Sequence, residues 1–116
     1  MTAPTNAKIL DLEHLNRVTF GDAALKGEIL KMFRDQARAL QNDLSIEMDL
    51  EARQRLAHTL KGSARGIGAN AIGEIAELIE ISALPAAAYA EALKRLDTVI
   101  QETEISIETE IGINPN

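Results

Sequence analysis

Cysteine and tryptophan are absent from this chain of 116 residues, and aromatic residues make up only 3% of it. Without cysteine, a disulfide framework and thiol chemistry are excluded, and a reducing compartment suits the chain. Because aromatic residues are so few, the core must consist of Leu, Ile, Val and Ala, which suits packed helices better than a sheet. No stretch approaches the ~18 apolar residues of a membrane span, and the N-terminal MTAPTNAKIL lacks the pattern of a signal peptide. We expect a cytoplasmic protein with no membrane partner.

Positive charge is also scarce. The chain has 12 Lys and Arg against 18 Asp and Glu, a net charge of −6 at pH 7. Nucleic-acid binding needs a basic face that displaces counterions, so we expect no nucleic-acid partner. The length is that of one domain with a real core.

Apolar residues recur at intervals of three and four, which is typical of amphipathic helices. The spacing predicts one short helix followed by four longer ones, of which the second helix in the chain has about 24 residues. The third helix should run to about residues 66–68, and Gly112 and Pro115 should end the last one. The expected helix starts are Asp11 or a neighbour, Asp22, Asp49 and Asn70 as N-caps, and Pro85 in a first turn. The expected apolar stripes are Leu25, Ile29, Met32, Phe33, Leu40 and Leu44; Ile72, Ile75, Leu78 and Ile79; and Tyr89, Leu93, Leu96, Ile100 and Ile107.

Short connections make sequential helices antiparallel neighbours. The predicted fold is therefore all-α, an antiparallel up-down four-helix bundle with a short additional N-terminal helix that covers one end. The bundle spans residues 9–112, between a flexible N-terminus at 1–8 and a C-terminal tail at 113–116. The stretch TEISIETEI alternates as a strand would, but a lone strand has no partner, so a helix is favoured there.

The stretch AHTLKGSARGIG contains His58, one of only two histidines. On a helix with about 100° per residue, the apolar Leu56, Leu60 and Ile67 fall opposite this histidine, which argues against a core histidine. The remaining alternative to a functional site is an ordinary exposed polar residue.

The neighbours of His58 favour a functional site. Lys61 and Arg65 share its face and could stabilise an anion on the imidazole. Gly62 costs a helix about 1 kcal/mol against alanine, yet it leaves bare backbone that a large group can approach. Histidine is an established nucleophile, and a phosphoryl group is the electrophile that best matches adjacent cations. The pattern predicts a histidine that accepts a phosphoryl group.

The stretch AHTLKGSARGIGA resembles the signature of histidine phosphotransfer (Hpt) domains, and the chain resembles their free-standing bacterial type. The matching residues are His58, Leu60, Lys61, Gly62, Ser63, Ala64 and Gly68, and the likeness extends from about residue 10 to 110. Many relay members have a glutamine twenty-two residues after the histidine, where this chain has Glu80. That departure is similar to the phosphotransfer domains of chemotaxis kinases, in which a glutamate holds the imidazole. The alternative is that Glu80 is one exposed acid among many.

The resemblance implies that His58 accepts the phosphoryl group, Lys61 stabilises it and Glu80 orients the imidazole. Partner-binding residues would be Gln54, Arg55, Gly62 and Arg65. The implied function is a phosphoprotein that relays phosphate between aspartates of receiver domains in a multistep two-component phosphorelay. Its partners would be response-regulator receivers and a hybrid sensor histidine kinase.

The resemblance also implies that a receiver supplies Mg²⁺, so we expect no cofactor or metal site in this chain. The chain lacks a Walker pattern, so it would bind no ATP and would not phosphorylate itself. We expect a monomer, and we expect His14 to be an ordinary surface residue. The alternative function is a non-catalytic helical adaptor that binds or sequesters a receiver.

Overall fold

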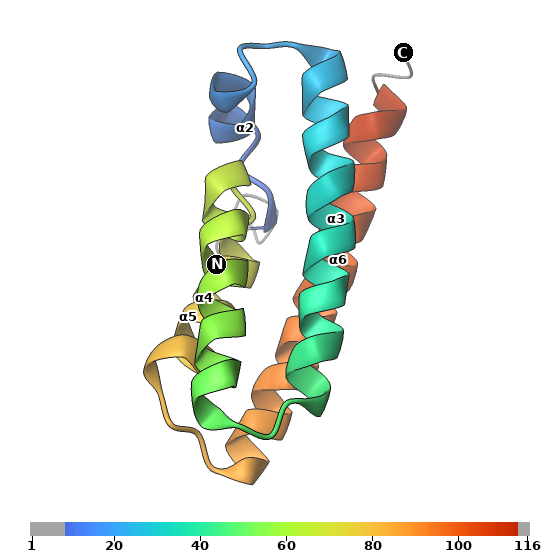
Figure 1. Ribbon diagram of the computed structural model, residues 1–116. Helices are drawn as coiled ribbons and strands as arrows, with labels where there is room; N and C mark the ends of the chain where they lie inside the picture. Colours follow the sequence, from blue (N-terminus) through green and yellow to red (C-terminus); the bar gives the residue numbers. More distant parts are fainter. Residues whose placement is uncertain (1–8, 114–116) are drawn as a thin grey trace, which may run out of the picture.

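The structure, a computed structural model, describes residues 9–113, and five helices lie wholly within that range (Figure 1). They are α2 (Leu12–Val18), α3 (Ala23–Ile46), α4 (Leu50–Ile67), α5 (Asn70–Ile81) and α6 (Ala86–Ile113). Residues 9–113 contain no strand, so the prediction of an all-α fold is confirmed. The predicted N-terminal segment and residues 114–116 of the predicted tail, with Pro115, lie outside the described residues.

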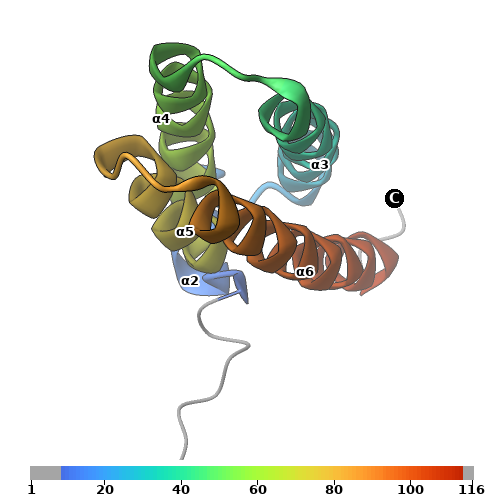
Figure 2. The same cartoon turned by 90° about the horizontal axis from the view of Figure 1, so that it is seen from below.

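The longer helices form a closed ring of contacts, in which α3 packs on α4, α4 on α5, α5 on α6, and α6 on α3. Figure 1 shows α3 beside α6 along much of its length, with α4 and α5 on the other side of the molecule. Figure 2, seen from below, shows α5 beside α4, α6 running from α5 along the lower side of the molecule, and α2 near α4. α4 therefore contacts three other helices, α2, α3 and α5.

Three aspartates begin helices as predicted. The side chains of Asp11, Asp22 and Asp49 each accept a hydrogen bond from the backbone N–H three residues later. Such a bond satisfies a donor that has no partner within the helix. The predictions for these N-caps are confirmed because the interaction is local.

The predicted N-cap at Asn70 is wrong. Asn70 is the first residue of α5, and the N-cap is Ala69, which makes no side-chain capping bond. The turn explains this, because Gly68, the C-cap of α4, has the left-handed conformation (φ 86°) and Ala69 is completely buried. A buried position favours a small apolar side chain over a polar cap.

The start and end of α6 differ from the expectation by small shifts. Pro85 stands just before the helix, where its carbonyl accepts from Tyr89 N–H at 2.8 Å. Gly112 does not end the helix, which continues to Ile113, and its φ is not positive. A glycine commonly ends a helix by taking the left-handed conformation, which Gly112 does not adopt. The stretch TEISIETEI is helical, and Ile107 is buried.

The apolar stripe of α3 differs from the prediction at Met32, which is 71% exposed. The buried face of α3 is formed by Leu30, Phe33, Ala37 and Leu44. Met32 lies about 100° around the helix from Phe33, so it points away from this face. The prediction for Met32 is therefore wrong.

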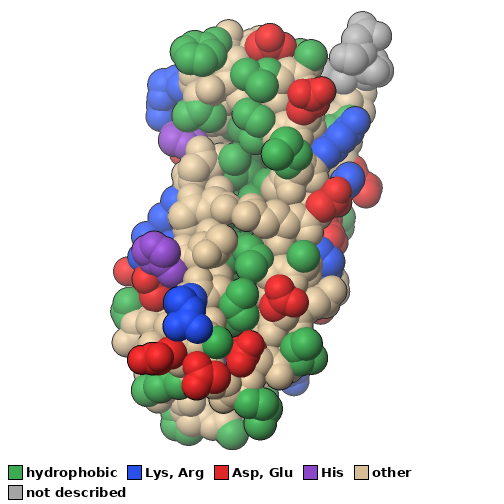
Figure 3. All heavy atoms as spheres, in the orientation of Figure 1, with side chains coloured by type: hydrophobic (Ala, Val, Ile, Leu, Met, Phe, Trp, Pro, Cys, Tyr) green, Lys and Arg blue, Asp and Glu red, His purple; other side chains and the backbone are tan. Residues whose placement is uncertain are grey.

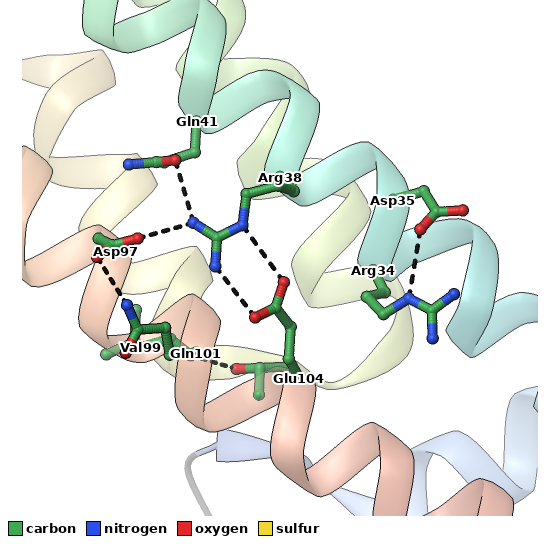
Figure 4. A network of polar contacts seen from close by, with 9 residues as sticks. Arg34, Asp35, Arg38, Gln41, Asp97, Val99, Gln101 and Glu104 are labelled. Carbon is green, nitrogen blue, oxygen red and sulfur yellow. Dashed lines mark hydrogen bonds and ion pairs between the residues drawn. The ribbon is translucent and has the colours of Figure 1, made fainter.

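A polar network fixes α3 against α6 (Figure 4). Arg38 donates from Nη1 to Asp97 Oδ1 at 2.7 Å and from Nη2 to Glu104 Oε1 at 3.0 Å. These bonds, first that to Glu104, raise the pKa of Arg38 above its ordinary value. Gln41 accepts a further bond from the same guanidinium. The network lies on the α3–α6 side of the ring, away from His58.

Tyr89 ties the start of α6 to the last turn of α3. Its buried hydroxyl donates to the carbonyl of Leu44 at 2.7 Å, and burial raises the pKa of the phenol. The guanidinium of Arg53 lies over the ring, 3.8 Å from its centroid, and donates to the carbonyl of Glu47. These contacts hold the N-terminal half of α4, which leads to the candidate site at the middle of the helix.

Candidate functional site

His58 lies near the middle of α4 with 68% of its side chain exposed. Its neighbours Ala57 and Leu60 are completely buried, so the helix presents the imidazole outward while it packs its other face. This is the placement that the helical spacing predicts.

One carboxylate connects His58 with Lys61. Glu80, in the last turn of α5, places Oε2 at 2.5 Å from His58 Nδ1 and Oε1 at 2.6 Å from Lys61 Nζ. A carboxylate only accepts, so Nδ1 carries the hydrogen and donates it. The other ring nitrogen, Nε2, has no hydrogen-bond partner within residues 9–113. The arrangement leaves the Nε2 lone pair available.

The electrostatics keep Glu80 ionised. Its bond with Lys61, and next its bond with His58, hold the pKa of the Glu80 carboxyl below its ordinary value. Only 21% of the side chain is exposed, so the carboxylate is enclosed by the partners that it binds. A charged acceptor makes a stronger hydrogen bond than a neutral one, which favours a fixed ring orientation.

Gly62 has no steric function within the fold. It is exposed, and a Cβ built there would meet nothing within 4 Å. Gly68 differs, because it has a positive φ and its Cβ would lie 2.9 Å from the carbonyl oxygen of Asp11. Gly62 and Gly68, two of the three glycines of the stretch, therefore differ in kind. Gly68 is required by the chain's own turn, while Gly62 leaves open space beside His58.

The predicted partner-binding residues are not equivalent either. Arg65 forms an ion pair with Glu77 of α5, and its Cγ would lie 3.0 Å from a Cβ at Gly73. Gln54 and Arg55 instead line a hollow of about 690 Å³ together with His58. The structure brings these two residues to the imidazole and turns Arg65 toward α5.

The same hollow contains two residues that sequence reasoning missed, Glu51 and Thr59. Glu51 lies two turns before His58 on the same face, so its helical position could have identified it. Figure 3 shows acidic and basic side chains gathered around a histidine on the α4 side of the molecule.

His14 is not the ordinary surface residue that we expected. It is half-buried, and its Nε2 lies 2.9 Å from the carbonyl oxygen of Gly66. A carbonyl only accepts, so Nε2–H donates to the last turn of α4. Gly66 lies 52 residues after His14 in the sequence, so no local pattern indicates this contact.

Residues 9–113 contain neither a candidate metal site nor a candidate membrane span. In the described part of the chain, no three His, Cys, Asp or Glu side chains group as metal ligands would. Between residues 9 and 113, none of the helices combines the length and the apolar character needed to cross a bilayer.

Comparison with known proteins gives one match. The family model of the Hpt domain matches residues 28–105, which is more than half of the 116-residue chain. No curated protein and no solved structure matches the sequence. The matched range includes His58, Lys61, Gly62 and Glu80, the residues of the candidate site. The chain belongs to the Hpt domain family, whose members transfer phosphoryl groups through histidine in phosphorelays and interact with response-regulator receivers.

Proposed function

We propose that His58 carries a phosphoryl group between aspartates of receiver domains in a multistep two-component phosphorelay. The observation that carries this proposal is the bond between His58 Nδ1 and Glu80 Oε2 at 2.5 Å on an exposed ring. Because Glu80 occupies Nδ1, Nε2 is the nitrogen left to attack.

The transfer step is a displacement at phosphorus. The Nε2 lone pair forms the P–N bond while the P–O bond of the aspartyl phosphate breaks, and the aspartate carboxylate leaves with the electron pair. Nδ1 keeps its proton, so the ring becomes positively charged, and the Glu80 carboxylate beside it balances that charge. Transfer onward to a second receiver is the reverse of this step.

Two neighbours would assist the partner. Lys61 lies on the same helix face one turn after His58, and its ammonium could move from Glu80 Oε1 to a phosphoryl oxygen. Gly62 would let the receiver approach the ring because a side chain is missing there. The receiver would supply the Mg²⁺, so we propose no cofactor for this chain.

The same proposal includes the arrangement of the helices, the oligomeric state and the cellular location. We infer an antiparallel up-down bundle of α3 to α6, with α2 at the C-terminal end of α4. A monomer suffices because His58, Lys61 and Glu80 come from one chain. We place the relay in the cytoplasm, with a hybrid sensor histidine kinase upstream.

The test uses phosphoramidate, a small phosphoryl donor that needs no protein partner. Intact mass and peptide mapping at neutral pH should place one phosphoryl group on His58, and His58→Gln should remove it. His14→Gln is the matched control and should leave labelling unchanged. A receiver loaded with Mg²⁺ should then discharge the label. Absence of label, or equal label on His14, would refute the proposal and leave the non-catalytic adaptor as the better explanation.

A further inference from the structure

Three cationic side chains, Arg55, Lys61 and Arg65, belong to the part of α4 around His58. Two of them are already engaged within the fold. Lys61 Nζ lies 2.6 Å from Glu80 Oε1, and Arg65 is paired with Glu77. Each can still donate to an anion, but its charge is already partly balanced by a carboxylate in the resting protein.

Arg55 differs from both. It is exposed, and its guanidinium has no hydrogen bond or ion pair within residues 9–113. It stands three residues before His58, a spacing that places two side chains on neighbouring positions of one helix face. It also lines the hollow of about 690 Å³ that contains His58 and Glu80.

We propose that Arg55 binds the phosphoryl group at His58, before Lys61 leaves Glu80. This inference rests on the proposed function and adds a residue to it. A guanidinium presents N–H donors in a planar fork that matches two phosphoryl oxygens, and it remains charged at any physiological pH. His58 and Arg55 line the same hollow, so Arg55 would meet the phosphoryl group both during the attack and once it is bound to the ring.

The carboxylates around Arg55 do not prevent this role. Glu51 lies one turn before Arg55 and lines the same hollow, but no ion pair joins them in the described structure. Exposed pairs of this kind are weak and screened by salt. Glu80 is already held by His58 and Lys61. An incoming phosphoryl group with two negative charges therefore competes well for the Arg55 guanidinium.

The test compares Arg55→Gln with Arg95→Gln. Arg95 is an exposed cation on α6 that does not line the hollow, so its replacement changes the net charge equally without changing the hollow. With phosphoramidate as donor, ammonia leaves with the protons that its nitrogen already carries, and no receiver is needed. The initial labelling rate of Arg55→Gln should fall at least about tenfold. Arg95→Gln should label as the wild type does, and Arg55→Lys should recover part of the rate.

A second readout separates binding of the phosphoryl group from a structural effect. A neighbouring cation favours the doubly charged phosphoryl group, so the pH titration of its ³¹P signal should shift to higher pH in Arg55→Gln. Labelling by phosphoramidate at the wild-type rate would overturn the proposal. Slower transfer from a receiver with normal phosphoramidate labelling would also overturn it, because Arg55 would then bind only the partner. Failure of the wild type to label His58 would instead refute the proposed function itself.

Discussion

Replacement of Gly62 by alanine should stabilise the protein and at the same time impair its transfer reaction. Gly62 lies within α4, it is exposed, and a Cβ there meets no atom within 4 Å. Alanine is better than glycine in a helix interior by about 0.8–1.0 kcal/mol. With no steric cost to subtract, the free energy of unfolding should rise by about that amount. For a domain of this size, the midpoint of thermal unfolding should rise by ~4 °C.

Transfer from a receiver should change in the opposite direction. A methyl group in a closely packed contact costs about 1–3 kcal/mol, so the transfer rate should fall about tenfold or more. Labelling by phosphoramidate should change little, because a small donor can avoid the methyl group. The assays are urea unfolding followed by circular dichroism, and transfer of radioactive phosphate from a phosphorylated receiver.

Gly27→Ala is the matched control. Gly27 lies in α3 and also has nothing within 4 Å of a built Cβ, so it should show the stabilisation without the loss of transfer. If Gly62→Ala transferred phosphate at the wild-type rate, the open space beside His58 would not serve the approach of a partner. If it unfolded at lower urea concentration, the surroundings of Gly62 would be more crowded than the structure shows.

Three further predictions concern Glu80 and Tyr89. Glu80→Gln should leave the His58 ring free to turn, so that ³¹P spectra of the variant show phosphate on both ring nitrogens instead of Nε2 alone. A spectrum identical to that of the wild type would contradict the orienting role of Glu80. The pKa of Glu80 is lowered in the folded state, so its stabilisation is present above the ordinary value of 4.5 and is lost as pH falls through the lowered value. Urea midpoints of the wild type and Glu80→Gln should therefore differ at pH 7 and converge in acid. Tyr89→Phe leaves the buried carbonyl of Leu44 without its donor and should cost about 1 kcal/mol in urea unfolding, whereas an unchanged midpoint would show that water replaces the hydroxyl.

Local interactions explain which features the sequence predicts correctly. Asp11, Asp22 and Asp49 cap helices through bonds to residues three positions away, so their effect depends on little beyond the adjacent chain. The outward placement of His58 likewise follows from helical periodicity alone. No tertiary information is needed for either.

The errors occur where tertiary packing decides. Asn70 has good capping chemistry, but the two-residue turn buries the position before α5, and a small apolar residue occupies it. Met32 fits a three-and-four spacing, yet the neighbours of α3 select a buried face that begins at Leu30. Several apolar sets are compatible with one helix, and the sequence does not say which of them the other helices will cover.

The site shows the same division. The spacing of α4 indicates the cations near His58, but it cannot show that Lys61 and Arg65 already have partners on α5. Glu80 was identified only through a family resemblance, because its position depends on how α4 and α5 pack. Small buried residues on both helices, Ala64 and Gly73 among them, allow that packing.

The bridging carboxylate makes the chemistry of one helix depend on the integrity of another. Glu80 is the penultimate residue of α5, and helix ends fray more readily than helix centres. If that turn unwinds, His58 and Lys61 lose their common partner in a single event, since both bonds end on one side chain. Ring orientation, lysine position and the opening of the last turn of α5 are thus one coupled equilibrium. Hydrogen exchange of the backbone amides in that turn should therefore report on the orientation of the His58 ring in α4.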